Sequence, residues 1–265
     1  MEIAINALLT VVGLVLLCFG GNWLVSGGVS IAKKLRISQM VIGLTVVAYG
    51  TSTPELAASV AASLGSHTDL ILGNIVGSNI SNVGMVIGIS AIISPLVVSK
   101  ATTRKEVPIM IGVMLLLVAM SIDGEISQYD GVLLIAGLIA FTVYTVSRAK
   151  KERKKEEEDT SAQKSSMPKA VGLVAIGSGL LYLGGYLTIE NVVSIAQGIG
   201  VSETVVGITI VAIGTSLPEL ITSLIAIKKG HTDIGIGNIV GSNIYNILMI
   251  MGVASVITGI AVVPE

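Results

Sequence analysis

The sequence has few of the residues on which soluble enzymes and metal centres depend. Only 12% of its 265 residues are charged, against about 25% in an ordinary soluble domain, so a soluble globular enzyme is not expected. The single cysteine, Cys18, excludes an intrachain disulfide and a thiolate metal cluster, and we expect it to pack inside the first apolar segment. The two histidines, His67 and His231, are too few for a histidine-based zinc site.

Several functional signatures are also missing. The formal net charge of -1 provides no basic field for a nucleic acid partner. The sequence has no nucleophile–base–acid triad, phosphate loop or ATP motif, so we expect neither an enzyme nor a primary pump, and no cofactor. The first basic residue is Lys33, so the positive start of a cleavable signal peptide is lacking and the N-terminus is predicted to be a retained membrane helix. No obligate protein partner is evident.

Apolar residues, in contrast, make up 52% of the chain, and the mean hydropathy is +0.88. A membrane-spanning helix needs about 20 mostly apolar residues. The sequence therefore predicts an all-α polytopic membrane protein in a lipid bilayer. Its eight candidate spans are 3–25, 40–64, 70–94, 106–122, 128–147, 168–188, 204–227 and 234–258.

The basic residues predict how these spans are oriented. All 16 Lys and Arg residues follow an odd-numbered span, whereas the connections after even-numbered spans contain none. By the positive-inside rule, the connections after odd-numbered spans are cytoplasmic and the N-terminus lies outside the cell membrane. The polar segment 148–169 is then a solvated cytoplasmic linker between a first half, 1–147, and a second half, 170–265.

The two halves contain a repeated segment. Residues 41–88 align without gaps on residues 205–252, at an offset of 164 residues, with 27 of 48 positions identical. The copies start at the second and seventh spans, and an odd number of spans separates them, so the second copy is inverted in the membrane. Inverted repeats are typical of secondary transporters, which bind their substrate near the bilayer midplane where the copies meet.

A polar cluster recurs inside both copies. Glu55 and Glu219 are the ionisable residues deep within the spans, and a charged group there needs compensation, most simply a bound cation. Each follows a proline, in GTSTPEL (50–56) and GTSLPEL (214–220), and proline opens the helix near the preceding Gly-Thr pair. Freed carbonyls, hydroxyls and a carboxylate are hard oxygen ligands, which suit Ca²⁺ and Na⁺.

The next helix of each copy supplies a second polar wall. In GNIVGSNISN and GNIVGSNIYN, polar residues recur every four positions and share one helix face, next to glycines that allow close helix approach. These residues line the site or, alternatively, only hold helices together. They are Asn74, Ser78 and Asn82 with Gly73 and Gly77 in the first copy, and Asn238, Ser242 and Asn246 with Gly237 and Gly241 in the second.

These doubled motifs resemble the alpha repeats of the cation/calcium exchanger superfamily, and over all eight spans the chain resembles a prokaryotic sodium/calcium exchanger. The resemblance implies a Ca²⁺ site formed by Glu55 and Glu219 with the backbone carbonyls of Thr51 and Thr215. It also implies Na⁺ sites that share the two glutamates. Their further ligands are the carbonyls of Ala48 and Ala212 and the side chains of Ser52, Ser216, Ser78 and Ser242, with Asn82 and Asn246 at the remaining central positions.

Two features depart from that family. Members often have an acidic residue at one of the central positions, but here both are asparagine, which leaves two formal negative charges and an open stoichiometry. The family has ten helices in an inverted 5+5 plan, whereas this sequence provides 5+3 spans, so we expect a fragment that lacks two C-terminal helices.

The leading hypothesis is secondary antiport of Ca²⁺ against Na⁺, normally in the direction of Ca²⁺ export. One alternative is a Ca²⁺/H⁺ or K⁺-dependent antiporter in which the glutamates carry protons or K⁺ also binds. A further alternative is a cation channel that does not exchange, or an inactive shortened homologue.

Overall fold

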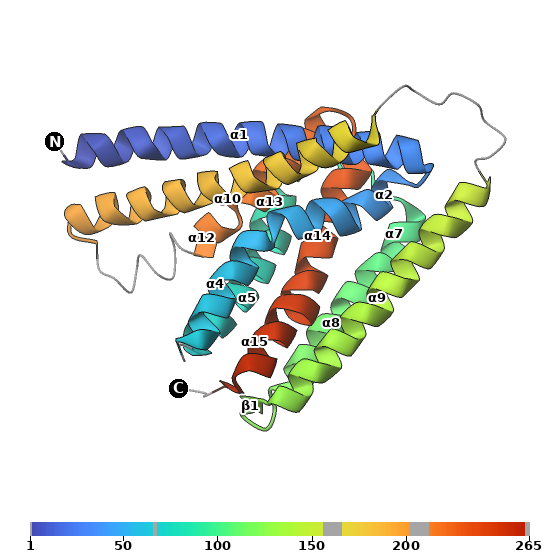
Figure 1. Ribbon diagram of the computed structural model, residues 1–265. Coiled ribbons are helices and arrows are strands. Elements are labelled where there is room, and N and C mark those ends of the chain that lie inside the picture. Colours follow the sequence, from blue (N-terminus) through green and yellow to red (C-terminus); the bar gives the residue numbers. More distant parts are fainter. Residues whose placement is uncertain (1, 66–67, 156–165, 202–211, 263–265) are drawn as a thin grey trace.

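The computed structural model describes residues 2–65, 68–155, 166–201 and 212–262, and within these ranges the chain is helical apart from its connections and one pair of two-residue strands (Figure 1). The first half contains α1 (Glu2–Leu35), α2 (Gln39–Ile42), η1 (Gly43–Val47), α3 (Ala48–Thr51), α4 (Thr53–Leu64), α5 (Thr68–Ser81), η2 (Asn82–Val86), α6 (Ile87–Ile93), α7 (Lys100–Arg104), α8 (Glu106–Met120), β1 (Glu125–Ile126) and α9 (Gln128–Lys155). The second half contains α10 (Met167–Gly198), α12 (Ala212–Thr215), α13 (Leu217–Lys228), α14 (Thr232–Tyr245), η4 (Asn246–Met251), α15 (Gly252–Ile257) and β2 (Ile260–Ala261).

Five helical segments of the described chain are long and apolar enough to cross a membrane, and they coincide with five of the predicted spans. They are Ile3–Leu35, Leu70–Ile93, Gln128–Lys151, Met167–Gly198 and Thr232–Ile257. The predicted span 40–64 is instead interrupted at Ser52, and α8 is only 15 residues long. Residues 204–211 of the predicted span 204–227 lie outside the described residues, and the remaining two thirds are interrupted at Ser216.

The long helices α1 and α10 lie side by side, antiparallel, across one end of the other helices (Figure 1). Small residues line their contact. A Cβ added at Gly13 would lie 2.8 Å from the carbonyl oxygen of Gly184, and one added at Gly20 would lie 2.8 Å from that of Gly177. Gly177 and Gly184 are the residues 164 positions after Gly13 and Gly20, so the same contact occurs twice, related by a twofold axis.

The prediction that Cys18 is buried by packing inside the first apolar segment is wrong, because the residue is exposed. Helix α1 buries the side that carries Leu17 and Leu24, whereas Cys18 lies about 100° further round. Its exposed neighbours are apolar, among them Val15 and Phe19. An apolar surface of this kind suits contact with lipid.

Helix α14 lies at the centre of the molecule, and every residue from Ile234 to Tyr245 is buried. It contacts α13 of its own copy and η1, α2 and α3 of the other copy, with α8 on a further side. Gly237 and Gly241 make this approach possible, since added Cβ atoms would lie 3.0 Å from the Cα of Gly43 and 2.7 Å from the Cβ of Ala48. Among the described residues, no atom lies within 4 Å of a Cβ added at Gly73, so the predicted close approach is not seen there.

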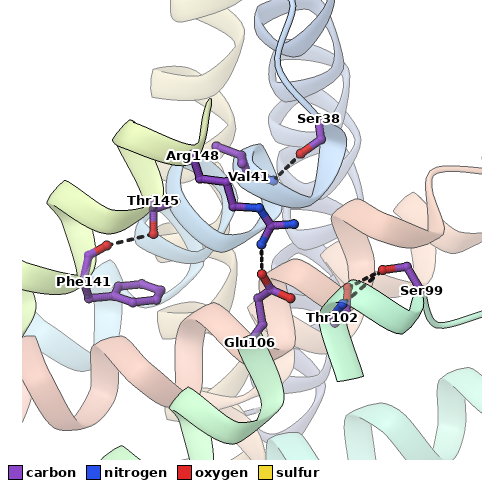
Figure 2. Close-up of polar contacts among 8 residues, drawn as sticks. All are labelled: Ser38, Val41, Ser99, Thr102, Glu106, Phe141, Thr145 and Arg148. Atoms are coloured by element: carbon purple, nitrogen blue, oxygen red, sulfur yellow. Dashed lines mark hydrogen bonds and ion pairs between the residues drawn. The ribbon is translucent and has the colours of Figure 1, made fainter. Parts of the chain in front are cut away.

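Helices α8 and α9 cover α14 and η4 and are joined by an ion pair (Figure 2). Arg148 of α9 reaches Glu106 in the first turn of α8, whose side chain is fully buried. We expected Arg148 to lie in a solvated linker, but α9 continues to Lys155 and only 20% of the Arg148 side chain is exposed. The antiparallel strands β1 and β2 join the connection after α8 to the segment after α15.

Candidate cation site

Both copies contain a helix interruption beside the predicted site. Helix α3 ends at Thr51 and α4 starts at Thr53, while Ser52 between them has φ −84° and ψ 5°. In the second copy Ser216 has nearly the same backbone angles, φ −86° and ψ 2°, between α12 and α13. Pro54 and Pro218 lie in the first turn after each interruption and have no N–H to donate to the preceding turn. The helix therefore opens within two residues of the positions predicted from the sequence.

The interruptions place Glu55 and Glu219 in the first turns of α4 and α13. Both side chains are buried, with 2% and 0% exposure, and the two carboxyl groups are close enough to interact electrostatically. The positive end of a helix dipole offsets part of the cost of a buried negative charge. The two predicted acidic ligands thus come together although 164 residues separate them in the sequence.

Hydroxyl groups of each copy contact polar groups of the other copy. Oγ1 of Thr51 lies 3.4 Å from Oγ of Ser242, and the equivalent atoms, Oγ1 of Thr215 and Oγ of Ser78, are also 3.4 Å apart. Ser52 does not cap the helix that follows it, and its Oγ donates instead to Oε1 of Glu219 at 3.2 Å. Each copy therefore contributes side chains to both sides of the site.

A second set of polar residues supports these groups. Asn238 accepts a hydrogen bond from Thr51 at 3.0 Å, and its Nδ2 donates to Ser223 at 3.0 Å. The equivalent contact in the first copy runs from Asn74 to Ser59 at 3.2 Å. Sequence reasoning missed Ser59 and Ser223, although each lies four residues after a buried glutamate and so on the same face of its helix.

The site contains buried oxygen atoms that have no hydrogen-bond partner among the described residues. A buried acceptor that is left unpaired costs about 1–3 kcal/mol, more if it is charged, so several together favour a bound cation. Both carboxylate and neutral oxygens are present, as Ca²⁺ and Na⁺ require. These atoms are both Oε atoms of Glu55, Oε2 of Glu219, Oγ of Ser216, and Oδ1 of Asn82 and Asn246.

The other predicted ligands lie around this cluster. Ala48 is buried at the start of α3, and Ala212 starts α12, the equivalent helix of the second copy. Asn82 and Asn246 each begin a π-helical segment, η2 and η4. Such segments often occur at functional sites, because the wider turn displaces the side chains around it. No three His, Cys, Asp or Glu residues gather anywhere in the described ranges, so the acidic groups of the site are the two glutamates.

The fold and the site define a class: a multi-pass membrane transporter with an inverted repeat and an oxygen-rich polar site at the contact between the copies. The family model described as sodium/calcium exchanger protein matches residues 5–147 and 169–265. The chain therefore belongs to the sodium/calcium exchanger family, and it is a transporter rather than an enzyme.

Individual relatives agree with this assignment. The chain is 39% identical over 258 residues to a putative antiporter, CaxA of Alkalimonas amylolytica, with 96% of this chain and 81% of that protein covered. It is 34% identical over 257 residues to the inner membrane protein YrbG of Escherichia coli (strain K12), covering 94% and 79%. The solved structure of the sodium-calcium exchanger NCX_Mj superposes with a TM-score of 0.85 at 33% identity, covering 98% of this chain and 85% of that one.

Proposed function

We propose that this protein is a secondary antiporter that exchanges Ca²⁺ for Na⁺. The observation that carries the proposal is the cluster of unpaired buried oxygens around Glu55 and Glu219, contributed by both inverted copies. Hard oxygen atoms in a buried site with two negative charges suit one divalent or two small monovalent cations. The family model and the structural match to a sodium-calcium exchanger support the same pair of ions.

Ca²⁺ and Na⁺ would share the two glutamates and differ in their other ligands. Ca²⁺ takes the two glutamates, whose charges balance its own, together with the backbone carbonyls of Thr51 and Thr215. Two Na⁺ ions share the same glutamates, so the two substrates compete for them. Further oxygens for Na⁺ come from the residues around the glutamates: the carbonyls of Ala48 and Ala212, the hydroxyls of Ser52, Ser216, Ser78 and Ser242, and the side chains of Asn82 and Asn246.

The inverted repeat suits alternating access. The site lies between two copies that contribute equivalent contacts, such as Thr51 with Ser242 and Ser78 with Thr215. Movement of one copy against the other can therefore open the same site towards either side of the membrane. From the distribution of basic residues we propose that the protein resides in the cell membrane with its N-terminus outside and residues 148–169 in the cytoplasm. We further propose that the Na⁺ gradient normally drives Ca²⁺ export.

The counter-ion can be tested in proteoliposomes that contain the purified protein. Vesicles loaded with Na⁺ and diluted into Na⁺-free buffer should accumulate Ca²⁺, and vesicles loaded with choline should not. A pH gradient in place of the Na⁺ gradient should fail to drive uptake, and added K⁺ should not be required.

The other outcomes identify the other functions. Uptake driven by the pH gradient alone would indicate a Ca²⁺/H⁺ antiporter, and uptake that needs K⁺ would indicate a K⁺-dependent exchanger. Ca²⁺ entry without any counter-ion, at a much higher flux, would indicate a channel. Absence of Ca²⁺ binding by calorimetry in detergent would contradict transport altogether.

A further inference from the structure

The asparagine that follows the serine of each GSN sequence lies beside the site but is not one of the proposed ligands. Asn79 in α5 and Asn243 in α14 occupy equivalent positions of the two copies, with 7% and 0% exposure. A buried amide normally has its donors and its acceptor paired. The partners of these two residues show what they do.

The side-chain amide of Asn79 forms its hydrogen bonds with the other copy. Its Oδ1 accepts a hydrogen bond from Nδ2 of Asn246 at 3.1 Å, and its own Nδ2 donates to the backbone carbonyl of Asn243 at 3.3 Å. Asn246 can meet Asn79 in this way only through its amide nitrogen, since an oxygen cannot donate. Its Oδ1 is therefore free for another partner, and this atom is buried without a hydrogen bond among the described residues.

The orientation of Asn246 matters because its two amide ends have opposite effects on a cation. The carbonyl oxygen is a ligand for Ca²⁺ or Na⁺, whereas the NH₂ group carries partial positive charge and repels them. Without Asn79, the Asn246 amide has no fixed partner and can rotate so that either end faces the site. Asn79 thus determines which atom of Asn246 the cation meets.

The equivalent residues of the other half, Asn243 and Asn82, are not hydrogen-bonded to each other in the described structure. Asn243 donates to the carbonyl of Ile239 in its own helix at 2.8 Å, and its Oδ1 has no partner among the described residues. Both amide atoms of Asn82 are also buried and unpaired within the described chain. A hydrogen bond from Nδ2 of Asn82 to Oδ1 of Asn243, equivalent to the one seen between Asn246 and Asn79, would satisfy one atom of each residue.

A second contact shows the same difference between the copies. Ser52 donates to Glu219 at 3.2 Å, but the equivalent Ser216 leaves its Oγ unpaired, and so does Glu55 with both carboxylate oxygens. The contacts of Thr51 with Ser242 and of Thr215 with Ser78, in contrast, are the same in both halves. These differences involve polar groups around Glu55 and Glu219, and transporters with inverted repeats reach their second state when one repeat moves against the other.

We propose that Asn79 and Asn243 are positioning residues that turn the carbonyl oxygens of Asn246 and Asn82 towards the transported cation. The two hydrogen bonds form alternately. Asn79 holds Asn246 in the conformation described here, and Asn243 holds Asn82 in the conformation that opens to the opposite side of the membrane. This inference rests on the proposed function, because it links the alternate formation of the two hydrogen bonds to the two conformations of an ion exchanger.

Calorimetric Ca²⁺ binding to the full chain in detergent tests the positioning role without requiring transport. Asn79→Leu should raise the Kd for Ca²⁺ at least tenfold, and so should Asn246→Leu. The double variant should be no weaker than the weaker single variant, because Asn79 acts through Asn246. Asn191→Leu is a matched control, since Asn191 is also 7% exposed and its Nδ2 donates to the carbonyl of Leu187 in its own helix. The Kd of this variant should stay within twofold of the wild type.

Two results would overturn the positioning role. One is a normal Kd for Asn79→Leu, and the other is a double variant in which the effects of the single substitutions multiply. Thermal unfolding of each variant, measured alongside, shows whether a lost affinity reflects a lost fold; a variant that unfolds at the wild-type temperature with a raised Kd supports positioning.

The alternation is tested by exchange measured separately at the two faces of sided proteoliposomes. Asn79→Leu should raise the KM for Ca²⁺ at least fivefold more at one face than at the other, and Asn243→Leu should reverse that preference. Equal increases at both faces for both variants would contradict the alternation. If the wild type binds Ca²⁺ but does not exchange it for Na⁺, the proposed function fails while the calorimetric test of positioning stands.

Discussion

The two buried glutamates set the chemistry of the site, because their neighbours are neutral. Hydroxyl groups reach Glu219 from Ser52 and Ser242, whereas the carboxylate oxygens of Glu55 are unpaired among the described residues. The site therefore has two formal charges and an unequal distribution of hydrogen bonds around them. Glu55 has more free oxygen atoms to offer a cation than Glu219 in this conformation.

His231 lies in the turn between α13 and α14, outside the membrane-spanning segments, where its Nδ1 is 3.0 Å from Oε1 of Gln39. Burial lowers the pKa of His231 below its ordinary value of 6.5, and the nearby Lys33 and Lys229 lower it further. The folded protein therefore binds a proton at His231 less readily than the unfolded chain does. The stability that neutral His231 contributes is complete above about pH 6.5 and is lost as the pH falls through the lowered pKa.

We expect the thermal unfolding temperature of the wild type to fall more than that of His231→Gln between about pH 7.5 and about pH 5.5. Glutamine does not titrate, so the difference between the two pH profiles isolates His231 from the carboxylates. Parallel profiles for the two proteins would show that protonation of His231 does not oppose folding.

At the residue scale, much of the site was readable from the sequence. The repeated Pro-Glu pairs predicted that Glu55 and Glu219 are buried and that the helix opens beside them, and the structure shows both. The sequence did not reveal that the copies exchange hydrogen bonds, because a contact such as Asn246 with Asn79 depends on how two helices cross. Periodicity within a helix identifies a face but not its partner.

At the scale of elements, the contact between α1 and α10 depends on glycine. A Cβ added at Gly177 would lie 2.6 Å from the backbone nitrogen of Leu24, whereas no atom of the residues that the structure describes lies within 4 Å of one added at Gly179. We expect Gly177→Ala to destabilise the protein by about 1–3 kcal/mol, because the backbones must move apart. Gly179→Ala should leave stability unchanged or raise it by up to about 1 kcal/mol, because alanine favours the helix and meets no clash.

Thermal unfolding in one detergent distinguishes the two variants. The two glycines lie two residues apart on the same helix, so helix propensity affects both equally and only the packing differs. An equal loss of stability in the two variants would contradict the close contact between α1 and α10.

The ion pair between Arg148 and Glu106 gives a second prediction for the elements. Arg148→Met should destabilise the contact of α8 with α9 by about 3–5 kcal/mol, because it leaves the fully buried Glu106 carboxylate without its partner. The double variant Arg148→Met/Glu106→Gln should recover most of that loss, since no buried charge remains between α8 and α9. A double variant as unstable as Arg148→Met would show that the loss comes from packing instead.

The sequence did not predict this ion pair. Arg148 starts a strongly polar run, which indicated a solvated linker, and Glu106 follows the basic residue Lys105 at the edge of a span. Local composition could not show that α9 continues to Lys155 or that its turn at Arg148 passes the first turn of α8.

For the whole molecule, the repeat was the most informative feature of the sequence. The odd number of spans between its two copies predicted the inversion, and the twofold-related contacts of Gly13 with Gly184 and of Gly20 with Gly177 agree with it. The proposed exchange of Ca²⁺ for Na⁺ is open to direct measurement.

The most direct test is Na⁺-driven Ca²⁺ uptake in proteoliposomes by Glu55→Gln and Glu219→Gln. Each substitution keeps the shape of the side chain and removes one of the two charges that we propose bind the cation. We expect both variants to fall to the uptake of protein-free vesicles, while Glu106→Gln/Arg148→Met, which neutralises a buried glutamate outside the site, retains uptake near that of the wild type. Na⁺-dependent uptake at the wild-type rate in either site variant would contradict the assignment of Glu55 and Glu219 as the shared ion ligands.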